Sequence, residues 1–202
     1  HDVNHLLGVV EETLSEERRQ RQVIKEMLQK YQHLAHHDTL TGLPNRSLFA
    51  DRLQQMLAQA KRSTTLGALL YLDLDKFKPI NDTLGHDMGD LVLKEIASRL
   101  HTAVRESDTI ARIGGDEFVV LLPAIESKQD ASTVAEKIRL ALEQPFEIKS
   151  HSINIGCSIG IAVYPEHGID EIGLMKNADT AMYHAKKNGR NNVQMYHQGM
   201  DP

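Results

Sequence analysis

The chain has 202 residues, of which 41% are hydrophobic and 25% charged, with a formal net charge of −5 at pH 7. This composition is typical of a soluble globular domain with an appendage, and the acidic balance argues against a general electrostatic grip on nucleic acid. No apolar run approaches the roughly 20 residues that a membrane-spanning helix needs, so we expect no direct membrane contact from this chain. The single cysteine, Cys157, cannot form an internal disulfide, which fits a cytoplasmic location. There is no signal peptide, and because residue 1 is not Met, we expect a piece of a longer protein whose membrane attachment is open.

Residues 1–35 carry a helical pattern with apolar or aromatic side chains at seven of nine positions spaced alternately by three and four. The nine positions are Leu7, Val10, Leu14, Glu17, Arg21, Ile24, Leu28, Tyr31 and Ala35. A parallel coiled coil is the favoured interpretation of this stalk, because no second helix in the chain offers a matching seam. The alternative is one amphipathic helix lying on the following domain.

Residues 36–197 alternate between helical and strand patterns, and residues 198–202 begin a linker. Gly42 and Pro44 end the stalk, and Asn45 can cap a helix that runs to about Arg62. Gly114-Gly115 indicates a two-residue hairpin turn. Further helices are predicted near 89–104, 127–143 and 169–187, and strands near 66–74, 109–113, 117–122, 146–149, 153–163 and 193–196. This order predicts an α/β (α+β) fold, a ferredoxin-like or palm-type sandwich with a central, mostly antiparallel sheet flanked by helices and preceded by a long helix.

Two groups of carboxylates stand at predicted strand ends. Asp73-Leu74-Asp75 ends an apolar strand, and Asp116-Glu117 follows the Gly-Gly turn. A buried unpaired carboxylate is costly, so these acids need a reason. If the two strands are neighbours, the acidic oxygens meet at one edge of the sheet and suit Mg²⁺ or Mn²⁺. Taken alone, the first group is more typical of a solvated loop start or a helix cap, and the Gly-Gly turn of an ordinary hairpin.

Polar and basic residues suggest a nucleotide. Lys78 could reach a phosphate, and Asn81 with Asp90 could read the hydrogen-bonding edge of guanine. Lys186 and Arg190 lie one helical turn apart and could clamp a triphosphate. On physical grounds alone, a solvated helix end facing the helix dipole is the favoured interpretation of these last two cations.

Five segments together resemble the GGDEF domain family, in its order and spacing, over residues 36–197. They are 38–46 (DTLTGLPNR), 73–90 (DLDKFKPINDTLGHDMGD), 112–118 (RIGGDEF), 158–162 (SIGIA) and 178–191 (ADTAMYHAKKNGRN). The resemblance implies a diguanylate cyclase, a metal-dependent nucleotidyltransferase that condenses two GTP molecules into cyclic di-GMP and two pyrophosphates. None of the motif positions departs from the family's pattern.

The resemblance also implies roles for individual residues. Catalysis falls to Asp73, Asp116 and Glu117, and metal binding to these acids with the Leu74 carbonyl. Glu117 is either a further metal ligand or helps to deprotonate the attacking hydroxyl. Substrate binding falls to residues of three kinds: Asn81 and Asp90 for guanine, Lys78, Lys186 and Arg190 for phosphates, and Lys76, Phe77, Gly114 and Gly115 around the pocket.

The resemblance implies a homodimer, because one domain holds one GTP and the product needs two domains face to face. The stalk would keep the two domains together. Arg105-Glu106-Ser107-Asp108 resembles the family's RxxD product-inhibition site, in which Arg105 and Asp108 hold cyclic di-GMP. The alternative for that segment is an ordinary surface loop.

Two other functions remain open. The chain could be a silent module that binds GTP or cyclic di-GMP and regulates an attached domain, or mainly a dimerisation module. We expect an upstream sensor domain in the parent protein, and the tail permits a downstream EAL phosphodiesterase domain.

Overall fold

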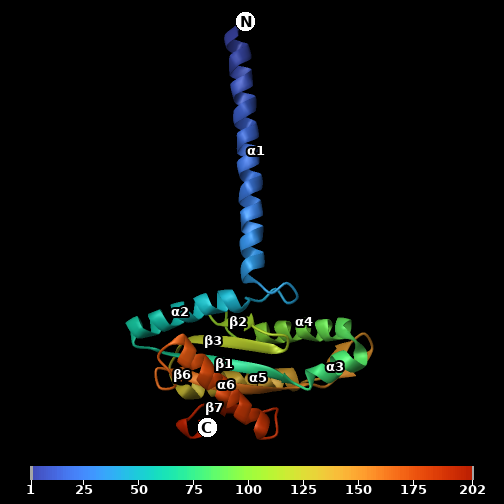
Figure 1. Ribbon diagram of the computed structural model, residues 1–202, viewed down its shortest axis with the longest axis vertical. Helices are drawn as coiled ribbons and strands as arrows, with labels where there is room; N and C mark the ends of the chain where they lie inside the picture. Colours follow the sequence, from blue (N-terminus) through green and yellow to red (C-terminus); the bar gives the residue numbers. More distant parts are fainter. Residues whose placement is uncertain (1, 202) are drawn as a thin grey trace. The chain divides into compact units, whose positions relative to one another are not determined.

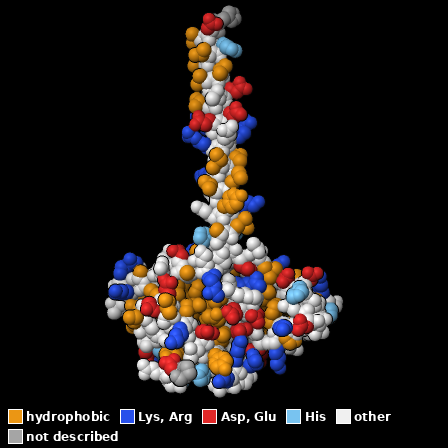
Figure 2. Space-filling view, viewed as in Figure 1, with side chains coloured by type: hydrophobic (Ala, Val, Ile, Leu, Met, Phe, Trp, Pro, Cys, Tyr) orange, Lys and Arg blue, Asp and Glu red, His pale blue; other side chains and the backbone are white. Residues whose placement is uncertain are grey.

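The computed structural model describes residues 2–201. Its contacts divide the chain into two units, with the boundary between His37 and Asp38. The first unit is α1 (Asp2–His36), and none of its residues over that range is buried. Hydrophobic side chains are visible along this helix in Figure 2. The polar break in the seam is satisfied within the helix, because Arg21 Nη2 lies 2.6 Å from Glu17 Oε1. The predicted long helix is therefore present with its apolar seam exposed, while the coiled coil itself stays a prediction.

The second unit is built on a five-stranded sheet whose strand order is β2-β3-β1-β6-β7 (Figure 1). The sheet strands are β1 (Leu66–Asp75), β2 (Thr109–Arg112), β3 (Glu117–Ile125), β6 (Gly156–Tyr164) and β7 (Val193–Met195). All neighbouring pairs are antiparallel except β6 and β7, which are parallel. The predicted sandwich with a mostly antiparallel sheet and flanking helices is confirmed.

Helices pack on both faces of this sheet. They are α2 (Arg46–Ser63), α3 (Phe77–Leu84), α4 (His86–Ala103), α5 (Lys128–Glu143) and α6 (Glu171–Lys187), with a short 3-10 helix η1 (Gln198–Met200) near the end. A small separate hairpin pairs β4 (Phe146–Ile148) with β5 (His151–Ile153). Local signals set several helix starts: Asn45 Oδ1 accepts from Leu48 N at 3.1 Å, as predicted, and Ser127 with Asp130 forms a capping box.

Strand β1 is buried from both sides, and its alternation divides the core in two. Leu70 and Leu72 pack with residues of α4 and α5, whereas Leu69 and Tyr71 pack with residues of α2 and α6. The same period of two carries Asp73 and Asp75 onto the face that α6 covers. The close approach of α6 depends on Gly160 in β6, where a Cβ would lie 2.1 Å from the Ala178 carbonyl oxygen.

Three local predictions were wrong. The segment before residue 89 forms α3, a helix of 8 residues that the pattern did not reveal, and α4 begins at His86. The predicted strand near 153–163 is two strands, β5 and β6. The hairpin turn is longer than two residues, because the last pair of the β2–β3 ladder is Arg112 with Phe118. Ile113 N and Gly114 N both donate to the Glu117 carbonyl oxygen, and neither Gly114 nor Gly115 has a positive φ.

Candidate active site

The two carboxylate groups meet at one end of the sheet, as the sequence predicted for neighbouring strands. Asp73 of β1 stands directly opposite Glu117 of β3, and Leu74 N donates to the Asp116 carbonyl oxygen at 3.1 Å. The pKa of Asp73 is raised from 3.8 to about 6, chiefly by burial and also by the charges of Asp116 and Glu117, against the opposing effect of Lys186. The site therefore concentrates negative charge that its own side chains only partly balance.

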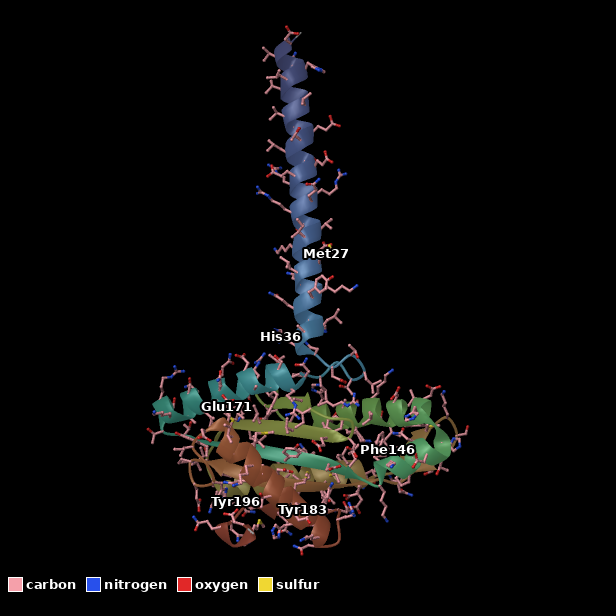
Figure 3. The ribbon with its side chains drawn as sticks, viewed as in Figure 1. Met27, His36, Phe146, Glu171, Tyr183 and Tyr196 are labelled. Carbon is pink, nitrogen blue, oxygen red and sulfur yellow. The ribbon has the colours of Figure 1, made fainter. Side chains whose placement is uncertain are left out.

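Helix α6 places a lysine against these acids. Lys186 Nζ donates to Asp73 Oδ2, and both side chains are largely buried, with 26% and 10% of their surfaces exposed. Figure 3 labels Glu171 and Tyr183, which mark the first residue of α6 and the turn before Lys186. The favoured interpretation of Lys186 as a solvated helix-end cation is thus wrong, because Gly160 lets α6 lie close enough for Lys186 to reach β1.

Arg190 was expected one helical turn beyond Lys186, and this was also wrong. Helix α6 ends at Lys187 with Asn188 as its C-cap, and Arg190 lies in the following loop with φ of +63°. Its Nη1 lies 3.8 Å from Asp75 Oδ1. The two cations still face the same strand end, each near a different acid of β1.

Two further residues of this face were not predicted from the sequence. The Tyr71 hydroxyl donates to Glu117 Oε2 at 2.6 Å, and burial together with this bond raises the pKa of Tyr71 well above its usual range. Burial, followed by the charge of Glu117, raises the pKa of Asp179 on α6. The signal for Tyr71 was available, because it stands two residues before Asp73 on the same face of β1. Nothing local indicates Asp179, which arrives with α6.

The residues proposed for guanine are brought together by α3 and α4. A Cβ on Gly89 would lie 1.8 Å from Asn81 Oδ1, so the Asn81 amide of α3 packs directly against Gly89 of α4 and a larger residue there would displace it. The next residue after Gly89 is Asp90, which is exposed. Asn81 and Asp90 are therefore neighbours in space, as the guanine hypothesis requires.

The other pocket residues fall into different environments. Phe77 is 6% exposed and belongs to the core, so it supports α3 from beneath instead of forming an open floor. Lys76 and Lys78 are exposed at the start of α3, and Lys76 has a φ of +60°. Both lysines are therefore accessible to a ligand.

Arg112 ties the Gly-Gly turn to the segment that enters the domain. Its Nη2 donates to the Gly115 carbonyl oxygen at 2.9 Å, and its Nη1 lies 3.1 Å from Asp38 Oδ1. Burial would raise the pKa of Asp38, but hydrogen bonds from Thr41 and the charge of Arg112 lower it. This pair explains why segments 38–46 and 112–118 occur together, a link that the sequence showed only as two motifs.

The chemistry of the acids fits a divalent cation. Within residues 2–201, no group of three or more His, Cys, Asp and Glu side chains is already arranged to hold a metal ion. Asp73, Asp116 and Glu117 nevertheless offer hard oxygen donors around a site of excess negative charge. Such a set suits Mg²⁺ or Mn²⁺ when substrate phosphates complete the coordination.

The RxxD segment lies at the other end of β3. Asp108 Oδ2 accepts from Arg105 N at 2.9 Å, and Arg105 Nη2 lies 3.2 Å from Asp108 Oδ1 and 3.4 Å from the Pro123 carbonyl oxygen. The Arg105 side chain is 60% exposed, whereas that of Asp108 is 1% exposed. Pro123 is six residues along β3 from Glu117, which corresponds to about 20 Å. The segment is thus separate from the carboxylates, and its arginine is accessible.

Comparisons with known proteins agree with this geometry. The family model "Diguanylate cyclase, GGDEF domain" matches residues 35–192. The chain is 51% identical over 168 residues to the bifunctional diguanylate cyclase/cyclic di-GMP phosphodiesterase MucR of Pseudomonas aeruginosa, covering 83% of this chain and 24% of MucR. It is 46% identical over 159 residues to the diguanylate cyclase TpbB of the same organism, covering 78% of this chain and 37% of TpbB.

The chain therefore spans between a quarter and two fifths of these relatives. The solved coiled coil and GGDEF domain of DgcB from Caulobacter crescentus, in complex with c-di-GMP, superimposes with a TM-score of 0.84 and 31% identity, over 92% of this chain and 98% of that one. Among the described residues, no helix is long and apolar enough to cross a membrane. By sequence and by structure, this chain belongs to the GGDEF family of diguanylate cyclase domains.

Proposed function

We propose that this domain condenses two GTP molecules into cyclic di-GMP with release of two pyrophosphates. The observation that carries the proposal is the meeting of Asp73, Asp116 and Glu117 at one sheet end, faced by a partly buried lysine from α6. A nucleotide binder without catalysis has no evident need for three carboxylates that repel one another. A metal-dependent phosphoryl transfer does, because developing charge must be balanced at one place.

Each residue of the site then has a task. In each half-reaction, the ribose 3′ oxygen of one GTP forms a bond to the α-phosphorus of the other, and the bond to pyrophosphate breaks. Bound Mg²⁺ or Mn²⁺ would lower the pKa of the attacking hydroxyl and balance phosphate charge, held by Asp73, Asp116, Glu117 and the Leu74 carbonyl. Glu117, held by Tyr71, stands ready to help remove the hydroxyl proton.

Nucleotide recognition is divided between two parts of the domain. Asn81 and Asp90 match the donors and acceptors on the edge of guanine, which excludes adenine. Lys186, Arg190 and Lys78 neutralise the triphosphate. Lys186 pairs with Asp73 in this structure. Binding of a triphosphate with its metal would give Lys186 a phosphate, and Asp73 the metal, as the new partner.

The test is product analysis by chromatography after incubation of the chain with GTP and Mg²⁺. We expect cyclic di-GMP from the native chain and a loss of at least about 100-fold in rate for Asp116→Ala, since a ligand of the reacting centre is removed. No product even at concentrations that favour dimers would overturn the proposal.

That outcome would favour the second candidate, a silent GTP- or cyclic di-GMP-binding module. The relation to MucR, whose name carries both activities, makes an attached phosphodiesterase domain and an upstream sensor worth testing in the parent protein.

We further propose that residues 1–35 form a parallel coiled coil that pairs two catalytic domains, each spanning residues 36–197. The exposed seam of α1 supports this, as does the likeness to a structure that comprises a coiled coil and a GGDEF domain. Removal of residues 1–34 should lower specific activity at low enzyme concentration, because two domains then meet only by diffusion. Unchanged specific activity would rule out this role of the stalk.

The RxxD segment is proposed as the product-inhibition site. Arg105 is accessible and Asp108 orients it, which suits stacking on guanine and a bidentate hydrogen bond to its edge. Arg105→Ala should raise the cyclic di-GMP concentration needed for half inhibition about tenfold, with uninhibited turnover unchanged. An unchanged inhibition curve would show that the segment is only a surface loop.

A further inference from the structure

Asp75 is a buried acid that the proposed reaction does not yet use. Its residue is 5% exposed at the end of β1. Oδ1 accepts from the Ser158 hydroxyl at 2.7 Å, and Oδ2 accepts from the backbone N of Asn191 at 2.8 Å. Both oxygens are thus occupied by protein donors, unlike a carboxylate waiting for a metal. A desolvated carboxylate is expensive, so these bonds call for a function beyond filling space.

The segment that Asp75 holds has an unusual backbone. Gly189, Arg190 and Asn191 follow one another with φ of +100°, +63° and +44°. Left-handed conformations cost non-glycine residues about 1–2 kcal/mol each and persist only where surrounding contacts enforce them. The bond from Asn191 N to Asp75 is one such contact.

Arg190 N also donates to the Ala185 carbonyl oxygen of α6 at 3.1 Å, and helix α5 supplies two further contacts. Asn191 Oδ1 accepts from Arg139 Nη1 at 3.3 Å, and Asn191 Nδ2 donates to Glu143 Oε2 at 3.1 Å. Gly156 leaves room for this side chain, because a Cβ there would lie 3.1 Å from Asn191 Cβ. The segment 189–191 is consequently clamped between β1 and α5.

Arg190 is the residue that this clamp presents. Its Nη1 lies 3.8 Å from Asp75 Oδ1 while its side chain remains 48% exposed. Arg190 and Asp75 line the same cavity of about 470 Å³. A long flexible cation is therefore held near its working place before any ligand arrives, and pre-ordering of this kind lowers the entropic cost of binding.

We infer that Asp75 is a positioning residue for the triphosphate: by fixing segment 189–191 it aims the Arg190 guanidinium at the outer phosphates of GTP. The inference rests on the proposed function, since it takes Arg190 as a phosphate ligand. It assigns Asp75 to the phosphate end of the site and leaves the metal to Asp73, Asp116 and Glu117.

The test is a double-mutant cycle on nucleotide binding. Affinity for 3′-deoxy-GTP, which lacks the attacking hydroxyl, is measured by calorimetry with Mg²⁺ for the native chain, Asp75→Asn, Arg190→Ala and the double variant. We expect Asp75→Asn to weaken binding about tenfold, or about 1.4 kcal/mol. In the Arg190→Ala background the same change should cost less than about twofold, because Asp75 acts through Arg190. Affinity for GMP, which has no outer phosphates, should change less than about twofold.

Two further variants guard against a trivial result. Ser158→Ala removes one hydrogen bond from Asp75 and should weaken binding about threefold, even if Asp75→Asn does not fold. Met56→Ala creates a cavity in α2, away from the site, and should lower the melting temperature without affecting 3′-deoxy-GTP binding.

The inference is overturned if Asp75→Asn binds 3′-deoxy-GTP with native affinity. It is also overturned if Asp75→Asn lowers the affinity for GMP as much as that for 3′-deoxy-GTP, or if it weakens 3′-deoxy-GTP binding as much in the Arg190→Ala background as in the native chain. Tighter binding would also overturn it, because Asp75 would then be competing with phosphate for Arg190. If the native chain binds 3′-deoxy-GTP but makes no cyclic di-GMP from GTP, the proposed catalysis fails, and the cycle still decides the role of Asp75. If the native chain does not bind 3′-deoxy-GTP, the inference about Asp75 fails, and product analysis with GTP still decides the proposed catalysis.

Discussion

Replacing Asp73 by asparagine should stabilise the metal-free protein while abolishing its activity. The Asp73 side chain is only 10% exposed, and its charge is disfavoured first by burial and then by Asp116 and Glu117. Asparagine keeps the shape and an oxygen acceptor for Lys186 but carries no charge. The native protein thus carries a charge that its fold does not favour, and function explains why.

The magnitude follows from the pKa of Asp73. A pKa raised from 3.8 to about 6 means that ionisation costs the folded state up to about 3 kcal/mol. This pKa already includes the attraction to Lys186, so we expect a gain of about 3 kcal/mol, or about 6–12 °C in melting temperature for a chain of this size. The folded state binds the proton more tightly than the unfolded state. The free energy of unfolding of the native chain, relative to that of Asp73→Asn, therefore falls as pH rises from about 4 to about 6 and stays constant above that.

The assay is calorimetric melting of both proteins in chelator between pH 4.5 and pH 8. The difference in free energy of unfolding in favour of Asp73→Asn should reach its full value above about pH 6 and shrink to about a third of that value at pH 4.5. Added Mg²⁺ should raise the melting temperature of the native chain more than that of the variant, since a ligand stabilises only the state that binds it. Asp51→Asn, at an exposed position of α2, is the matched control and should change stability by less than about 0.5 kcal/mol. A less stable Asp73→Asn protein at pH 7.5, or a gap independent of pH, would refute the reasoning.

Two other substitutions test the surroundings of the site. Tyr71→Phe removes the hydroxyl that donates to Glu117, so kcat should fall about tenfold while GTP affinity is kept. The free energy of unfolding should fall by about 0.5–1.5 kcal/mol. An unchanged kcat would mean that Glu117 needs no support from Tyr71. Gly89→Ala forces a Cβ to within 1.8 Å of Asn81 Oδ1, so KM for GTP should rise about tenfold or more and the preference for GTP over ATP should fall. A retained preference in steady-state kinetics would separate Asn81 from guanine recognition.

Much of the fold could be predicted from local patterns. The apolar run of β1, the spacing of α1 and the cap at Asn45 each report a preference that acts over a few residues, and the structure has all three. Helix α3 was not predicted, because 8 residues with Pro79 in the first turn show too little helical periodicity. Its stability comes from packing on α4, which the local sequence does not reveal.

The sequence by itself determined which residue types could do the chemistry: acids at strand ends, an amide and an acid for guanine, and cations near the end. Only the tertiary structure decided which of them meet. Lys186 and Asp73 are 113 positions apart, and they pair because Gly160 admits α6 onto the face to which the alternation of β1 turns its acids. Asp75 and segment 189–191 meet across a similar interval. Such contacts leave no local signal, since they depend on how close two elements pack and not on the preference of either one.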